Sequence, residues 1–147
     1  MSWFRRTTKT TTSQFTQTLS DELRTEPYDY PPGTAVVTDK GSYFINKDGK
    51  RYRIQSDEIF HSWMFPLVVD TTEDALKNFP VAVTRLGFRD GTLLNNIADG
   101  KLYLVSESKL RHIIGNHCLS ALGLDPNQAL VVSDADIKIM KQGEPLK

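Results

Sequence analysis

Residues 43–54 read Tyr-Phe-Ile-Asn-Lys-Asp-Gly-Lys-Arg-Tyr-Arg-Ile, and residues 103–113 read Tyr-Leu-Val-Ser-Glu-Ser-Lys-Leu-Arg-His-Ile. In both stretches a strand-like start leads through a turn and a basic cluster to an isoleucine. From Ile54 and Ile113 onward the two segments match at an offset of about 59 residues. This period indicates a duplicated structural unit, and small duplicated units more often hold or display something than catalyse.

Working outward from the hairpins, the pattern predicts an α+β fold. Each copy reads as a β-hairpin or meander, a short helix, an apolar stretch and a second short helix. Ser56 and Asn116 are expected to cap the first helix of each copy, and Gly123 is expected to end the second of these helices in a left-handed conformation. The predicted units span residues 33–90 and 91–147, preceded by an arm over residues 1–32.

Length and composition bound the classes of protein. The 147 residues suffice for one ordinary domain or two small ones that pack together. The charged residues balance, with 18 Lys and Arg against 18 Asp and Glu, which argues against a general nucleic-acid or membrane-surface binder. The N-terminus runs into threonines where a signal peptide would be apolar, and no apolar run is long enough to span a bilayer.

The N-terminal arm has its own composition. Threonines crowd positions 7–12, and the segment is too polar to fold alone. Phe15, Leu19 and Leu23 follow helical spacing, so a short helix is possible there. The alternatives are a frayed tail or an arm that orders against a neighbouring subunit. In the second case, its partner-binding residues are expected to be Trp3, Phe4, Arg5, Arg6, Phe15, Leu19 and Leu23.

The second copy in particular resembles a repeat found in bacterial surface and secreted proteins and in some phage proteins. The resemblance is carried by Tyr103-Leu104-Val105, by Lys109-Leu110-Arg111-His112-Ile113, by the run from Leu130 to Ile137 and by Gly143-Glu144-Pro145-Leu146. It covers roughly residues 33–147, and the first copy departs from it after Val69. The resemblance implies a noncatalytic module and transfers no catalytic residue.

The residues that could support chemistry have structural explanations. The acidic pairs Asp57-Glu58, Glu73-Asp74 and Asp134 with Asp136 follow Ser or Thr caps, where carboxylates favour the helix dipole. His112 and His117 lack the spacing of a helical metal pair, and Cys118 beside leucines reads as a buried thiol. We therefore expect no enzymatic activity, no metal and no cofactor.

The basic hairpins are the better candidates for binding. Charged residues around the tyrosines could meet a phosphate, an acidic glycan or an acidic neighbour, or they could simply protect exposed strand edges from aggregation. The possible surface contacts are Tyr43, Arg51, Arg53, Tyr103, Arg111 and His112.

Two functions follow as expectations. The build resembles a minor structural protein of a tailed-phage virion, in the tail, neck or capsid, whose arm joins it to other virion proteins and to copies of itself. The alternative is a module at the bacterial cell surface that binds envelope polysaccharide or another host surface glycan through the duplicated hairpins. Neither involves a membrane insertion or a specific nucleic acid.

Overall fold

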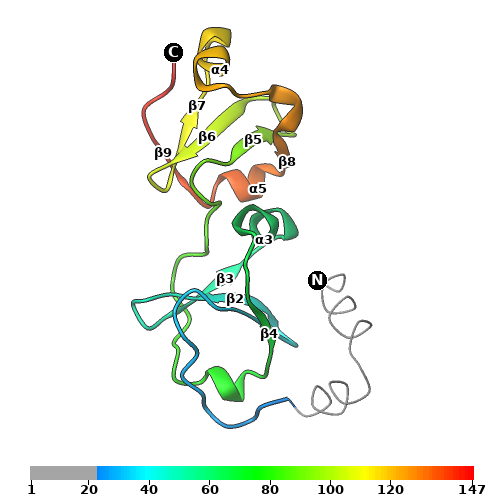
Figure 1. Ribbon diagram of the computed structural model, residues 1–147, viewed down its shortest axis with the longest axis vertical. Coiled ribbons are helices and arrows are strands. Elements are labelled where there is room, and N and C mark those ends of the chain that lie inside the picture. Colours follow the sequence, from blue (N-terminus) through cyan, green and yellow to red (C-terminus); the bar gives the residue numbers. More distant parts are fainter. Residues whose placement is uncertain (1–22) are drawn as a thin grey trace. The chain divides into compact units, whose positions relative to one another are not determined.

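The computed structural model describes residues 23–147 and has a mixed α+β architecture (Figure 1). Two compact units make up the chain. Among the described residues, unit 1 contains 23–54 together with Phe65–Arg85, and unit 2 contains Gln55–Met64 together with Leu86–Lys147. The division therefore differs from the predicted one at residue 90, because a segment of the first copy belongs to unit 2.

Unit 1 is built on a sheet with the strand order β3-β2-β1-β4. Its strands are β1 (Ala35–Thr38), β2 (Gly41–Ile45), β3 (Arg51–Ile54) and β4 (Val68–Asp70). The first three form an antiparallel meander, and β4 returns parallel to β1. A parallel bridge between Arg51 and Val81 extends the sheet beyond β3.

Unit 2 repeats this plan with the order β8-β5-β6-β7-β9. Its strands are β5 (Leu93–Asn96), β6 (Leu102–Ser106), β7 (Lys109–His112), β8 (Leu130–Val132) and β9 (Lys141–Gln142). Strands β5, β6 and β7 are antiparallel, whereas β8 and β9 join as parallel strands. The returning strand begins at Lys109, two residues before its predicted start at Arg111.

The duplication extends to single hydrogen bonds. Gly33 N donates to Ile45 O at 2.8 Å, and Gly91 N donates to Val105 O at 2.7 Å. The hydroxyls of Thr34 and Thr92 each donate a hydrogen bond to the carbonyl oxygen three residues earlier in the chain, at 2.7 and 2.6 Å. The two copies therefore begin before their hairpins, with Tyr30 in unit 1 corresponding to Phe88 in unit 2, and both residues are buried.

The second half of the first copy also keeps the plan, although its sequence departs after Val69. Thr72 Oγ1 accepts a hydrogen bond from Ala75 N, as Ser133 Oγ does from Asp136 N. These hydrogen bonds lie at the start of the short helices η1 (Asp74–Leu76) and α5 (Asp134–Ile137), and Ser133 is the N-cap of α5. Ala82 N then bonds Arg51 O in the way that Gly143 N bonds Leu110 O.

Two further helices follow the hairpins. In α3 (Asp57–Trp63) the predicted cap is confirmed, because Ser56 accepts from Ile59 N. Helix α4 (Asn116–Leu122) instead has Gly115 at its N-cap, so Asn116 is its first residue and not its cap. Gly123 ends α4 at a φ of 66°, as predicted. A 3-10 turn, η2 (Pro126–Gln128), leads on to β8.

The cores lie on the faces of the two sheets. In unit 1, Tyr30, Val36 and Tyr43 pack with η1 residues and Phe79. Residues 24–30, assigned from sequence to the arm, thus lie against unit 1: Tyr28 N donates to Ala75 O, and Arg24 O accepts from Thr72 Oγ1. In unit 2, Cys118 of α4 packs with the β5 and β6 side chains, and α5 lies on the other side of that sheet (Figure 1).

Candidate functional site

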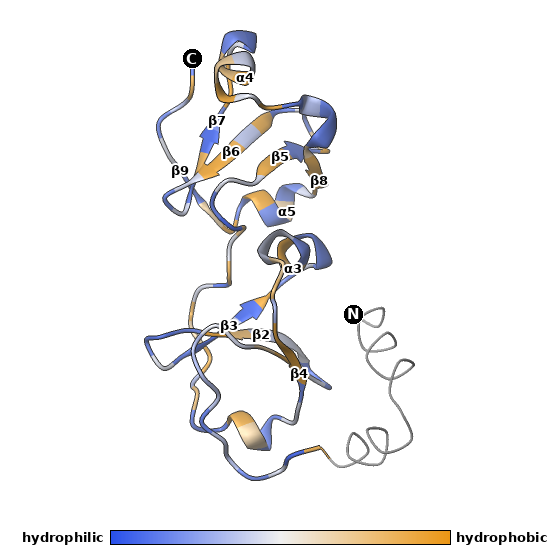
Figure 2. Cartoon of the chain, in the orientation of Figure 1, coloured by the Kyte–Doolittle hydropathy of each residue, from blue (hydrophilic) through white to orange (hydrophobic). Residues whose placement is uncertain are grey.

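A charged and aromatic cluster lies on the hairpin of unit 1, where β3 is markedly hydrophilic (Figure 2). The guanidinium carbons of Arg51 and Arg53 lie 4.7 and 4.9 Å from the centre of the Tyr43 ring. Arg53 also donates to the Tyr43 hydroxyl at 3.0 Å. The alternation of β3 and its register against β2 explain this contact, since Arg53 is directly opposite Tyr43.

Glu73 supplies the negative charge of the cluster. Its carboxylate accepts from Arg51 Nη1 at 2.8 Å and from Thr38 Oγ1 at 2.6 Å. Burial works against ionisation of Glu73, but the Thr38 hydrogen bond and the Arg51 charge outweigh it and lower the pKa of this carboxyl. Burial, followed by the proximity of Glu73, raises the pKa of Tyr43, so the phenol stays neutral.

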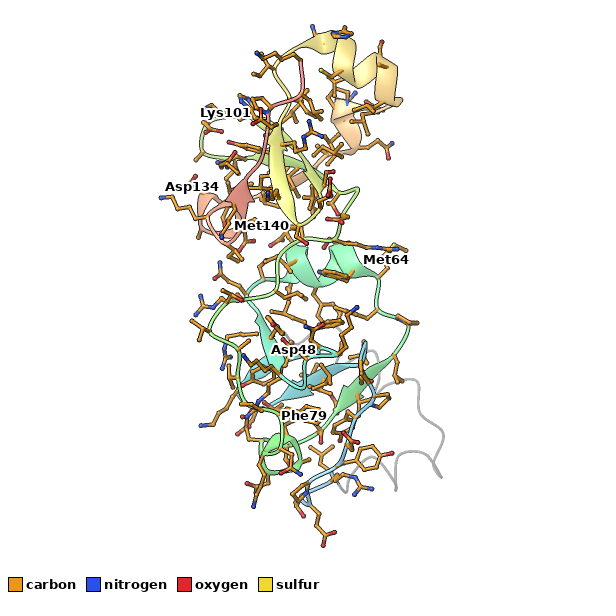
Figure 3. All side chains as sticks on the ribbon, turned by 90° about the vertical axis from the view of Figure 1, so that its left-hand side faces the viewer. Asp48, Met64, Phe79, Lys101, Asp134 and Met140 are labelled. Atoms are coloured by element: carbon orange, nitrogen blue, oxygen red, sulfur yellow. The ribbon has the colours of Figure 1, made fainter. Side chains whose placement is uncertain are left out.

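Unit 2 holds a version of the same cluster without its buried cation. Tyr103 stacks on His112 with ring centres 5.4 Å apart, and Asn96 Nδ2 donates to Asp134 Oδ1 at 3.0 Å. Asp134 stands where unit 1 has Glu73, at the start of α5 (Figure 3). Leu110 takes the position of Arg51 and is fully buried. Both copies therefore share one hydrogen bond between side chains. It joins the last residue of the first strand, Thr38 or Asn96, to the acidic residue at the start of η1 or α5, Glu73 or Asp134.

The predicted surface contacts are largely internal. Tyr43 and Tyr103 are 1% and 7% exposed, so neither ring is a platform on which a sugar or base could stack. Arg51 is buried, and Arg111 Nε donates to the backbone oxygen of Glu144. Arg53 and His112 are half-buried. The hairpins thus bring the predicted residues together within each unit, but mainly as supports of the sheet.

One buried donor in this cluster has no partner within residues 23–147. This donor is Arg51 Nε. Among the described hydroxyl groups, Ser42 Oγ is likewise buried without a hydrogen-bond partner. Both atoms are enclosed by protein. The cluster contains a cation, a carboxylate and a phenol, and these groups bond to one another within unit 1.

A second polar arrangement, in unit 2, was not found from sequence. Asp136 is 2% exposed, and its carboxylate accepts from Gln55 Nε2 at 2.8 Å and from Ser56 Oγ at 2.6 Å. Its position corresponds to Ala75 of the first copy. The sequence does contain a signal for this site, because a carboxylate stands where the first copy has an alanine. The signal becomes visible only when the two copies are aligned at Thr72 and Ser133. The acidic-cap explanation fits Asp134 but is incomplete for Asp136.

Cys118 and His117 of α4 differ in burial. Cys118 is buried, as predicted, whereas His117 is exposed. Across the part of the chain that the structure describes, no three His, Cys, Asp or Glu side chains are arranged to hold a metal ion. A search of those residues also found no helix with the length and apolarity to cross a membrane.

The predicted arm contacts fall mainly outside the described residues. Trp3, Phe4, Arg5, Arg6, Phe15 and Leu19 all belong to residues 1–22. Leu23 is described; it lies outside any helix and is 39% exposed.

Comparisons with protein families, with curated proteins and with solved structures found no match for this chain.

Proposed function

We propose that this chain is a noncatalytic structural protein of a tailed-phage particle, in its tail, neck or capsid, that works by assembling with other virion proteins and with copies of itself. The observation that carries the proposal is the way its polar and apolar groups are distributed. The hairpin arginines Arg51, Arg53 and Arg111 make contacts within their own units, whereas several large apolar side chains are exposed. These are Met64, Leu67, Val83, Ile97, Ile114, Leu122 and Val131.

Such a distribution suits contact between proteins better than chemistry. Catalytic sites bring titratable groups together in a cleft where a substrate can reach them. In this chain, Glu73 and Asp136 are instead held by internal donors. Exposed apolar side chains provide binding energy when a partner removes them from water. The exposed apolar side chains therefore support a role in assembly and not a role in catalysis.

The N-terminal segment adds a second contact in this proposal. Trp3 and Phe4 would serve as apolar anchors, and Arg5 and Arg6 would meet acidic surface on a neighbour. Because residues 24–30 pack against unit 1, a test deletion has to stop at residue 22 to leave the body intact.

The proposal is tested on purified particles of the phage or prophage that encodes the chain. Quantitative mass spectrometry should find the chain at a fixed number of copies per particle, and deletion of residues 2–22 should remove it from the particles while the truncated protein accumulates folded in cells. A double Trp3→Ala/Phe4→Ala variant should reproduce the deletion, and Thr10→Ala/Thr11→Ala should not. Particles that lack the full-length chain, although cells produce it, would overturn the proposal.

The glycan-binding alternative gains no support from the hairpins, because its two proposed aromatic platforms are buried. A pull-down of the full chain with cell-wall polysaccharide tests it separately.

A further inference from the structure

Three cationic side chains lie on one face of unit 2, where β7 and β9 run side by side. Lys109 and Lys141 are register partners in this parallel pair, so their side chains leave the sheet on the same face. Arg111 follows Lys109 by two residues on β7 and therefore shares that face. Both lysines are exposed, and Arg111 is half-buried. We call these three residues the cationic face.

Gly143, directly after β9, shows how the side chains from β7 lie. Its N–H donates to Leu110 O at 2.7 Å, so the glycine lies against β7. A methyl group on Gly143 would lie 3.2 Å from Lys109 Cβ and 3.5 Å from Arg111 Cγ. The stems of both cations thus lean over the glycine, toward the open side of the sheet. In sheets, glycine often marks a position where a ligand or another backbone approaches closely.

The cationic face has no carboxylate partner within residues 23–147. None of its three side chains forms an ion pair with a described Asp or Glu, including the nearby Glu107 and Glu144. Arg111 Nε donates to the backbone oxygen of Glu144 and not to its carboxylate. Lys109 and Lys141 are directly opposite each other, and like charges in such a pair destabilise a sheet. An anion from outside these residues would remove that cost.

The plan shared by the two copies does not account for these cations. When the copies are aligned by the equivalent hydrogen bonds of Ala82 and Gly143, the corresponding residues of unit 1 are Lys50, Tyr52 and Pro80. Only one of these is a cation, so the fold does not require the other two charges. Protection of a sheet edge against aggregation would explain a lysine on β9, but not two cations on β7, because β9 already covers that strand.

The sheet of unit 2 is open beside the cationic face. Strand β9 is the last in the order β8-β5-β6-β7-β9, and both of its residues are exposed. Gln142 is the register partner of Leu110, whose carbonyl accepts from Gly143 N, so Gln142 turns its own N–H and C=O away from β7. No backbone group of the described residues bonds Gln142 on that side. An extended peptide can therefore add to β9 as a further strand.

We propose that an extended acidic segment of a partner protein binds unit 2 by adding to β9, with its carboxylates on the cationic face. Side chains alternate along a strand, so carboxylates at every second position all turn toward Lys109, Arg111 and Lys141. Since Gly143 has no side chain, one of these carboxylates can meet the β7 cations that lean over it. Backbone hydrogen bonds supply affinity, and the charges select an acidic sequence and fix its register. The inference rests on the proposed assembly function and gives the chemistry of one partner.

The test measures, by fluorescence anisotropy, how the full chain binds a labelled synthetic peptide in which glutamate alternates with valine. The wild-type chain should bind this peptide at least about tenfold more tightly than the same peptide with glutamine in place of glutamate. Lys109→Gln/Lys141→Gln should weaken binding of the acidic peptide by about fivefold or more. Lys47→Gln/Lys50→Gln is the matched control, since it removes two exposed lysines from the hairpin of unit 1, and it should bind like the wild type. Circular dichroism establishes that each variant is folded.

A Gln142→Pro variant then distinguishes strand addition from attraction between charges. It keeps every cation but removes the N–H at the open edge, where a sheet tolerates proline, and it should also weaken binding about fivefold. The inference would be overturned by a wild-type chain that does not bind the acidic peptide, or by a Gln142→Pro chain that binds it like the wild type. Polyphosphate that binds more tightly than the peptide, and equally well to Gln142→Pro, would overturn it in favour of a phosphate site.

The inference and the proposed function can fail separately. A chain that binds the acidic peptide but is missing from purified particles would reject the proposed function alone. A chain that is present in the particles but does not bind the peptide would reject this inference alone.

Discussion

Met64 and Gly123 end equivalent helices with the same left-handed backbone, at φ values of 49° and 66°. Glycine adopts this conformation without a steric penalty, whereas a residue with a Cβ is strained there by about 1 kcal/mol. Met64 is 78% exposed, so its side chain contributes little packing in return. The second copy thus has the favoured helix end, and the first retains a strained one.

Replacing Met64 with glycine should therefore stabilise the protein. We expect Met64→Gly to raise the free energy of unfolding by about 0.5 to 1 kcal/mol, measured by urea denaturation. Gly123→Ala is the matched control and should lower it by a similar amount. No gain from Met64→Gly would show that the methionine makes a compensating contact.

Asp136 should be far more sensitive than its counterpart suggests. Asp136→Ala introduces the residue that the first copy has at Ala75, yet it leaves the Gln55 amide and the Ser56 hydroxyl without their buried acceptor. Loss of hydrogen bonds to a buried carboxylate should cost about 3 kcal/mol in unfolding free energy.

A double-mutant cycle assigns that cost to the contact. Gln55→Ala and Asp136→Ala should couple by about 1 kcal/mol or more, because the two side chains bond directly. Additive effects would mean that Asp136 acts through something other than this hydrogen bond.

Much of this architecture could be predicted because local signals carry it. The Asp48-Gly49 hairpin turn, the Ser56 cap and the Gly123 helix end all depend on residues next to one another, and the structure has them where they were expected. The duplicated pattern likewise predicted two units of one plan.

Features that depend on distant partners could not be predicted in this way. Nothing in the local pattern of α3 says that its contacts are with Gly87, Arg89 and Asp136 of unit 2. Tyr30, set among prolines and polar residues, also gives no sign that it bonds Thr71 at 2.8 Å within the core of unit 1. Tyr43 and Tyr103 could be considered as surface contacts from sequence because alternation shows that the two faces of a strand differ, but not which side chains will cover each face.

The turn between β6 and β7 offers another stabilising change. Glu107 and Ser108 both have positive φ, at 51° and 61°, in a two-residue connection that favours Asn-Gly. Glu107→Asn/Ser108→Gly should raise the unfolding free energy by about 1 kcal/mol, as followed by thermal denaturation. The bond from Ser108 N to Asp90 is made by the backbone and should persist. Gly49→Ala, at a φ of 82° in the other hairpin, should have the opposite effect.

The Glu73 cluster should make unit 1 sensitive to acid. Because the pKa of Glu73 is lower in the folded chain than in the unfolded one, its ionised form stabilises the fold fully above the ordinary pKa of an exposed glutamate. This contribution is lost as the pH falls below that value through the folded pKa. At neutral pH, Glu73→Gln should reduce the unfolding free energy by about 1 to 3 kcal/mol, since Arg51 loses its anionic partner. The difference between the two proteins should then shrink on acidification, when urea denaturation is repeated from neutral pH to about pH 3.

Arg51→Leu, which introduces the residue found at Leu110, removes the cation and should weaken the acid dependence without abolishing it, because Thr38 still bonds the carboxylate. If wild type and Glu73→Gln lose stability in parallel, then Glu73 does not couple folding to pH.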